Sequence, residues 1–91
     1  MYRLQLTSQF RKDCKRMKRR GLNMKELTDV INLLQAGKEL PSANRDHSLS
    51  GAYAGFRECH INPDWLLLYY VQSDRLVLVC ARTGSHSDIF G

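Results

Sequence analysis

The chain has 91 residues, of which 43% are hydrophobic and 25% are charged, and its formal net charge is +5. This length allows one domain, residues 1–91, with a modest core and the composition of a globular protein. No stretch approaches the roughly 18 apolar residues that cross a bilayer, and the first residues form no apolar secretory segment. We therefore expect a cytoplasmic protein that makes no membrane contact.

The charge is distributed unevenly between the two halves of the chain. Residues 1–45 contain eleven Lys and Arg against four Asp and Glu, whereas residues 46–91 contain three against five. A basic half suits a polyanion such as RNA, and an acidic protein is the other natural partner.

The three cysteines are Cys14, Cys59 and Cys80. Their number is odd, their spacing is wide, and the chain has no close Cys or His pair for a zinc site. We expect them to be small buried hydrophobic residues.

The first half predicts a strand followed by two helices. Residues 2–7 alternate apolar and polar side chains, the period of a half-buried strand. Ser8 is placed to cap a helix over residues 8–20, with Phe10, Cys14 and Met17 as its buried stripe and Gly21 as its stop. Asn23 and Glu26 resemble a capping box that opens a second helix, which runs to about residue 36 and packs antiparallel to the first.

The first helix carries a crowded basic face. Asp13 is the only acidic residue within it, so its cations repel one another, and contact with phosphate explains them better than a solvated surface does. The candidate contact residues are Arg11, Lys12, Lys15, Arg16 and Arg19.

The second half predicts a three-stranded meander. Residues 38–55 are polar and rich in turn formers, so we expect an ordered loop there. Strands follow at residues 56–61, 65–72 and 75–82, separated by short turns. The order strand, helix, helix, antiparallel meander predicts an α+β fold with the helices packed on one face of the sheet.

Five polar residues do not look structural, because they lie in loops or at strand ends: His47, His60, Asp64, Arg82 and His86. The meander would bring the strand ends together and form a site there. Two imidazoles can act as base and acid near neutral pH, and a guanidinium can stabilise charge on a phosphate.

Aromatic side chains near these positions could hold an unpaired base by stacking, and Trp65, Tyr53 and Phe90 are the candidates. The set suits RNA cleavage by attack of the ribose 2′-OH on the adjacent phosphate, without metal or other cofactor. Other interpretations stay open at this point: solvated histidines, an Arg82–Asp88 ion pair, Trp65 as a core residue, or a metal held by His60 and Asp64 with another histidine.

Four motifs of the second half occur in a familiar order: DHSLSG at 46–51, GFRECHI at 55–61, PDWLLLY at 63–69 and RTGSH at 82–86, followed by Phe90. Together they resemble the YafQ branch of the RelE/ParE toxin superfamily. The resemblance covers about residues 44–91, and the first half agrees in layout and basic character. Ser48 and Ala52 depart from the usual pattern in ways that affect loop shape and therefore codon preference.

The resemblance implies the RelE-like fold and a toxin of a type II toxin–antitoxin pair. Such toxins are metal-independent endoribonucleases that cut mRNA in the ribosomal A site. A cognate antitoxin, usually small and acidic, blocks the toxin, and the pair binds its own operator DNA through the antitoxin.

The resemblance also implies roles for the site residues. His86 is expected to be the general acid, His60 or His47 the base, and Asp64 to orient an imidazole. Arg82 would stabilise charge on the phosphate, and Phe90 would hold the base, with Trp65 beside the site. Two other classes compete: a gyrase inhibitor of the ParE type, or a simple RNA-binding module, neither of which needs the histidines.

Overall fold

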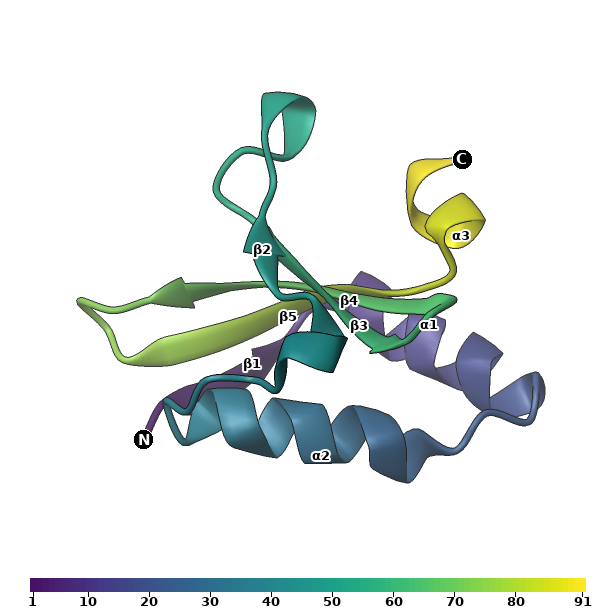
Figure 1. The fold of residues 1–91 in the computed structure, drawn as a ribbon, viewed down its shortest axis with the longest axis horizontal. Helices are drawn as coiled ribbons and strands as arrows, with labels where there is room; N and C mark the ends of the chain where they lie inside the picture. Colours follow the sequence, from purple (N-terminus) through teal and green to yellow (C-terminus); the bar gives the residue numbers. More distant parts are fainter.

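A five-stranded sheet in the order β1-β5-β4-β3-β2 forms the centre of the computed structural model, which describes residues 1–91 (Figure 1). The strands are β1 (Arg3–Leu6), β2 (His47–Ser48), β3 (Arg57–Asn62), β4 (Trp65–Gln72) and β5 (Val77–Gly84). The helices are α1 (Ser8–Arg19), α2 (Met24–Gln35) and α3 (His86–Phe90). Short 3-10 turns lie at Ser42–Asn44 and Gly51–Tyr53.

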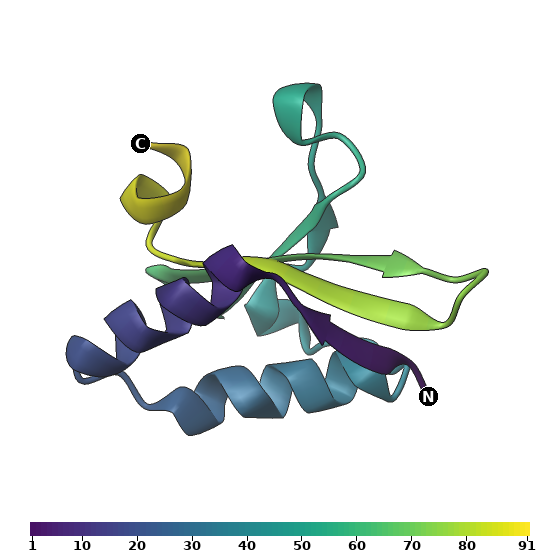
Figure 2. The same cartoon turned by 180° about the vertical axis from the view of Figure 1, so that it is seen from behind.

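The two long helices cover one face of the sheet, as the sequence predicts (Figures 1 and 2). Alternate residues of β4 and β5 point to this face, including Trp65, Leu67 and Leu78, and all three are almost fully buried. Burial of each large apolar side chain contributes about 1.5–3 kcal/mol, so this layer stabilises the fold. The buried helix residues that meet them are Phe10, Met17, Leu27, Val30, Ile31 and Leu34.

The predicted α+β class is confirmed, and the sheet has one more strand than expected. Within the predicted loop 38–55, β2 pairs antiparallel with β3. This strand has only two residues, which is too short for a visible alternation. The first strand, β1, pairs parallel with β5. Parallel neighbours need a long connection, and here the two helices and strands β2 to β4 lie between them in the chain.

Helix caps differ in detail from the predictions. Thr7, and not Ser8, is the N-cap of α1, and its Oγ1 accepts a hydrogen bond from the Phe10 N–H. Asn23 caps α2 through the Lys25 N–H, without the reciprocal bond of a capping box. The Thr7 Oγ1 also donates to the carbonyl of Ala81 on β5, so the cap ties α1 to the sheet.

Asp13, and not Cys14, completes the buried stripe of α1. Cys59 and Cys80 are fully buried, Cys14 is partly buried, and all three are free thiols. Burial raises the pKa of Cys59 and of Cys80 to about 12, so both are neutral packing groups. No helix of the structure has the length and hydrophobicity that a membrane span requires.

Candidate active site

The candidate site lies on the sheet face opposite the long helices. On this face the segment between β2 and β3 rises from one end of the sheet, and α3 rises beyond the end of β5 (Figures 1 and 2). Leu66 and Leu68 of β4 form the floor between them, and Ile89 of α3 packs on both. The face is therefore bordered by two chain segments that are far apart in the sequence.

One lateral row of this face carries three of the polar side chains. His47 of β2 pairs with Glu58 of β3, Glu58 pairs with Leu68 of β4, and Leu68 pairs with Arg82 of β5. Residues paired across strands point to the same side of a sheet. His60 lies two residues after Glu58 and so shares this face.

A β-bulge determines which way Arg82 points. Tyr69 pairs with Cys80, but the preceding residue of β4, Leu68, pairs with Arg82, so Ala81 is the extra residue. Each one-residue shift in pairing exchanges the two faces of a strand. The bulge therefore directs Arg82 to the site face while Cys80 and Thr83 stay on the helix side.

Glu58 holds the two histidines of this end of the site. Its Oε1 lies 3.7 Å from His47 Nε2 and 3.6 Å from His60 Nε2, and the carboxylate is nearly buried. His47 Nδ1 donates to the carbonyl of Arg45 at 2.7 Å, and His60 Nδ1 lies 3.4 Å from the carbonyl of Pro63. Because a carbonyl only accepts, each Nδ1 carries a proton, and each Nε2 faces the Glu58 carboxylate, which attracts the imidazole once Nε2 takes a proton.

Sequence reasoning missed Glu58. The signal was present, since Glu58 and His60 have the two-residue spacing that places both on one face of a strand. The two histidines differ in access, with 49% of the His47 side chain exposed against 16% of His60. His47 is thus open to solvent, and His60 is sheltered.

The arginine of the site is held from below by α1. Arg82 Nε and Nη2 donate to the carboxylate of Asp13 at 2.8 and 3.3 Å, and Nη2 is 3.4 Å from the Asp88 carbonyl oxygen. The expected alternative of an Arg82–Asp88 ion pair is wrong, because the Asp88 carboxylate is bound by both terminal nitrogens of Arg20 at 2.6 and 2.9 Å.

The C-terminal tail, residues 85–91, forms a short helix, α3, where no regular structure was predicted. Ser85 and Asp88 make a capping box, in which each side chain bonds the other's backbone N–H. Gly84 makes the turn into α3 with φ +154°, and an added Cβ would lie 2.9 Å from Asp88 Cβ. Only glycine fits both conditions, so this residue sets the approach of α3 to the sheet.

His86 and Phe90 lie one turn apart on α3, with ring centroids 4.9 Å apart. Phe90 also packs edge-to-face on Tyr53, at 4.9 Å, so the tail touches the raised segment between β2 and β3. Tyr53 also packs edge-to-face with Phe56, and Phe56 packs in the same way with Tyr70. This aromatic row joins the two borders of the site.

Two predicted site residues lie elsewhere. Trp65 is 1% exposed in the helix-side core, and its Nε1 donates to Thr83 Oγ1 at 2.8 Å, so no ring face is open to a base. Asp64 is exposed in the β3–β4 turn and makes no side-chain bond to a histidine, and Glu58 occupies the expected position beside the imidazoles.

The basic face of α1 is confirmed as an exposed surface with one exception. Arg11, Lys12, Lys15 and Arg19 are exposed. Arg16 instead turns inward, where its Nη2 donates to Asp13 at 2.9 Å and its Nε is buried 4.0 Å from Asp88. Arg16 is therefore a cation shared between these carboxylates and solvent, with 32% of its side chain exposed.

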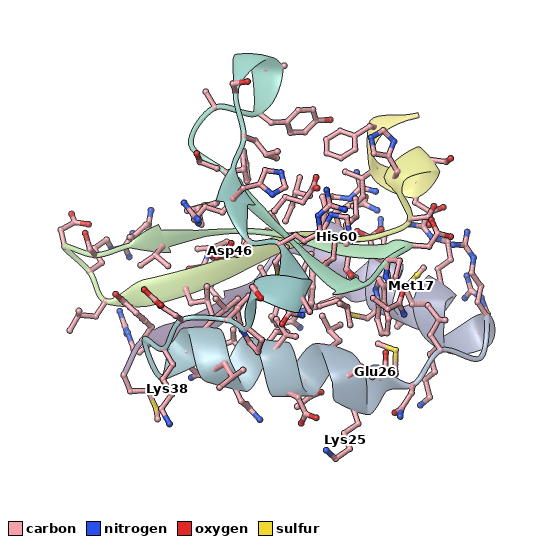
Figure 3. The ribbon with its side chains drawn as sticks, in the orientation of Figure 1. Met17, Lys25, Glu26, Lys38, Asp46 and His60 are labelled. Atoms are coloured by element: carbon pink, nitrogen blue, oxygen red, sulfur yellow. The ribbon has the colours of Figure 1, made fainter.

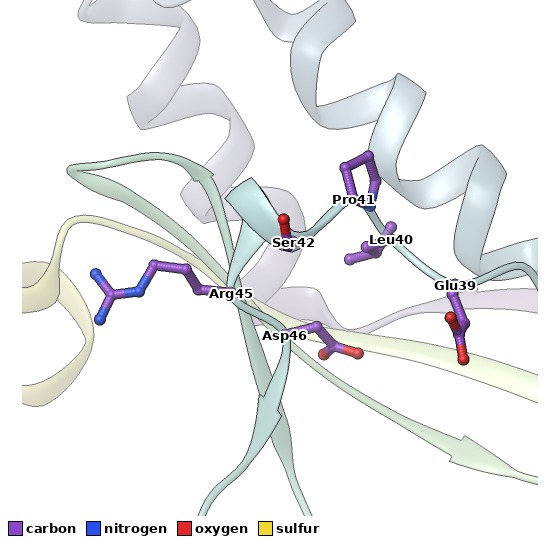
Figure 4. A pocket seen from close by; sticks show the side chains of 6 residues that line it. All are labelled: Glu39, Leu40, Pro41, Ser42, Arg45 and Asp46. Atoms are coloured by element: carbon purple, nitrogen blue, oxygen red, sulfur yellow. The ribbon is translucent and has the colours of Figure 1, made fainter.

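A surface hollow is lined by Glu39, Leu40, Pro41, Ser42, Arg45 and Asp46 (Figure 4). Asp46 accepts hydrogen bonds from Tyr69 Oη at 2.6 Å and from Arg57, which anchors the chain just before His47. Figure 3 labels Asp46, which lies just before β2, and His60 on the neighbouring strand β3. No group of three or more His, Cys, Asp or Glu side chains is arranged to hold a metal ion.

Comparison with known proteins agrees with this architecture. The family model described as bacterial toxin of type II toxin–antitoxin system, YafQ, matches residues 2–91. The mRNA interferase toxin YafQ of Escherichia coli strain K12 is 36% identical over 89 residues, 97% of this chain and 95% of that protein. The chain therefore belongs to the YafQ family of bacterial toxins.

Solved structures show the same fold. A chain of the Escherichia coli DinJ–YafQ complex superposes with a TM-score of 0.90, at 33% identity and with full coverage of both chains. A metal-bound toxin from Helicobacter pylori has a TM-score of 0.93 at 36% identity, covering 99% of this chain and 100% of that one. The RelE-like arrangement of helices and sheet is thus shared along the whole chain.

Proposed function

We propose that residues 1–91 act as one domain, the toxin of a type II toxin–antitoxin pair, and cleave mRNA as an endoribonuclease. One observation carries the proposal: a single sheet face brings together Glu58 with two histidines, the Arg82 guanidinium and the helix that bears His86. The name of the Escherichia coli relative, mRNA interferase toxin, supports the same reaction.

The reaction needs a base, an acid and a group that stabilises negative charge. His60 or His47, held at Nδ1 and beside Glu58, takes the proton of the ribose 2′-OH at Nε2. The 2′-oxygen bonds to phosphorus, the bond from phosphorus to the 5′-oxygen breaks, and His86 gives its proton to the leaving 5′-oxygen. Arg82 stabilises the charge on the phosphate oxygens, and each proton transfer contributes about 10²–10⁴-fold.

Binding uses two further surfaces. Phe90, with Tyr53 against its edge, holds a base of the substrate, since base–aromatic stacking contributes about 1–3 kcal/mol. The exposed cations of α1, chiefly Arg11, Lys12 and Lys15, contact ribosomal RNA and place the site in the ribosomal A site. Cleavage there stops translation.

The partners follow from the same proposal. A small acidic antitoxin complements the basic half of the chain, as DinJ assembles with YafQ in the Escherichia coli complex. Operator DNA is bound only through that complex, and the toxin acts in the cytoplasm, where mRNA and ribosomes meet. No metal or other cofactor takes part.

The test is cleavage of mRNA on ribosomes by the variants His86→Ala and Arg82→Ala, each verified as folded by circular dichroism. We expect a loss of about 10²–10⁴-fold in each. Full activity in both would overturn the assignment and favour a toxin that acts by binding alone. Toxin that is treated with EDTA and freed of the chelator before it meets the ribosomes should still cleave, and a loss that added Zn²⁺ restores would show a metal-dependent nuclease.

A further inference from the structure

A buried carboxylate on α1 lies directly beneath the arginine of the site. Asp13 is 0% exposed, although it is an acidic residue on the most basic helix of the chain. Its oxygens accept from Arg82 Nε at 2.8 Å, Arg16 Nη2 at 2.9 Å, Gln9 Nε2 at 3.0 Å and the Thr83 N–H at 3.1 Å. A buried charge is stable only with such partners.

The electrostatics of Asp13 agree with this geometry. Burial raises the pKa of a carboxyl, but the hydrogen bonds from Arg82, Gln9 and the Thr83 backbone outweigh it and hold the pKa of Asp13 below its usual value. Asp13 therefore stays ionised and keeps both oxygens available as acceptors for Arg82.

Asp13 also secures the edge of the sheet at this point. The parallel pairing of β1 with β5 ends at Leu6 and Cys80, so the backbone of β5 beyond Cys80 has no strand neighbour on that side. The Asp13 carboxylate accepts the Thr83 N–H in place of a strand carbonyl. One side chain thus fixes both the backbone and the guanidinium next to the β-bulge.

A row of ion pairs with alternating charge runs from Asp13 to α3. Arg16 bonds Asp13 and lies 4.0 Å from Asp88, and Arg20 bonds Asp88 at the base of α3. Ion pairs therefore join Arg82, on β5, through α1 to the helix that carries His86.

We propose that Asp13 is the positioning residue of the active site: it acts through Arg82 and aims the guanidinium at the phosphate. This inference rests on the proposed function. Asp13 itself touches no substrate, because it is buried beneath the sheet edge. A small displacement of a catalytic group is costly, on the order of 10²-fold per ångström.

The experiment is a double-mutant cycle on ribosome-dependent cleavage with Asp13→Asn and Arg82→Ala. Asp13→Asn should lower kcat by roughly 10- to 100-fold without changing KM. The carboxylate that orients the Arg82 guanidinium is lost, whereas the RNA-binding surface is intact. In the Arg82→Ala background the same substitution should change kcat by less than about twofold. An equal loss in both backgrounds would overturn the proposal.

A matched control separates positioning from simple destabilisation. Val30→Ala removes buried volume from α2, away from the site, and should lower Tm while cleavage is retained. If Val30→Ala lowers kcat as much as Asp13→Asn does at comparable Tm, Asp13 has only a structural role.

A second readout does not depend on activity. In ¹⁵N NMR spectra of the wild type, the Arg82 Nε–H should exchange slowly with solvent and should shift in Asp13→Asn. Rapid exchange in the wild type would overturn the proposal even if the variant does not fold. Slow exchange in a protein that does not cleave RNA would refute the proposed function and leave the Asp13–Arg82 link standing.

Discussion

Glu58 and His60 face each other at the sheltered end of the site, with Glu58 Oε1 3.6 Å from His60 Nε2. The same oxygen lies 3.7 Å from His47 Nε2, so one carboxylate serves both imidazoles. Strand β3 supplies Glu58 and His60 from a single face, and β2 adds His47 through its pairing with Glu58. The short strand β2 is therefore as important to the site as the longer strands.

Replacement of Glu58 tests this shared contact. Glu58→Gln keeps the shape but removes the charge that stabilises an imidazole when its Nε2 takes the proton, so single-turnover cleavage should fall by about 10- to 100-fold. Ribosome binding, measured by co-sedimentation, should not change, because Glu58 is nearly buried. Glu39→Gln, an exposed carboxylate of the surface hollow, is the matched control. Wild-type cleavage rates in Glu58→Gln would show that the contact is incidental.

Charge reversal on α1 tests the RNA surface. The double variant Lys12→Glu and Lys15→Glu should weaken ribosome binding by at least about tenfold and reduce the salt dependence of binding, because fewer counterions are released. Cleavage of ribosome-bound substrate at saturation should be close to wild type, since neither side chain belongs to the site. Lys38→Glu, an exposed residue after α2, makes the same kind of charge change as a control. Equal binding by all three proteins would refute the role of α1.

Truncation tests the tail. Deletion of residues 89–91 removes Ile89, which packs on Leu66 and Leu68, and Phe90, which packs on Tyr53. We expect cleavage to be abolished because α3 no longer holds His86 in place. The helix-side core is untouched, so the circular dichroism spectrum should show a folded domain. Normal RNA cleavage by the truncated chain would contradict this account of the tail.

Acid should weaken the protein through Asp13 and Asp88. Arg20 and Ser85 hold the pKa of Asp88 well below its usual value, and Asp13 is likewise lowered. A depressed pKa in the folded state means that the unfolded state binds more protons, so the stabilisation is present above about pH 4 and is lost as pH falls below it.

Urea unfolding at pH 5, 4 and 3 measures this effect. The free energy of unfolding should decline toward pH 3 in the wild type, and the decline should be smaller in Asp88→Asn, which has already lost the carboxylate. Asp29→Asn, on an exposed pair with Lys25, should follow the wild-type curve. A wild-type slope in Asp88→Asn would show that Asp88 does not contribute to the acid response.

Much of the architecture could be predicted from local patterns. The strand at residues 65–72 agrees with β4 at both ends, and the two long helices end within a residue or two of their predicted limits. Apolar periodicity and glycine stops are local signals that act within a few residues, so these elements can be predicted from the sequence directly. His47, His60, Arg82 and His86 could also be chosen as site residues, because polar side chains at element ends had no structural explanation.

Other features depended on contacts between distant segments. Trp65 was a candidate for stacking on a base, but it lies in the core, where its indole N–H donates to Thr83 Oγ1 on β5. Arg16 was expected to be one of the unpaired cations of α1, but it bonds Asp13 and lies near Asp88. Thr83 is far in sequence from Trp65, and Asp88 is far from Arg16. Only Asp13 lies one helix turn from the residue that it binds.

The sequence by itself determined the α+β class and the basic helix, and it indicated His47, His60, Arg82 and His86 as residues of the candidate site. The tertiary structure alone decided that Arg82 faces the site, since this depends on a bulge between β4 and β5. It also decided that Glu58 joins His47 and His60, and that Asp13 supports Arg82 from α1. The physical reason is that periodicity reports which face of its own element a residue occupies, whereas register and packing determine what that face meets.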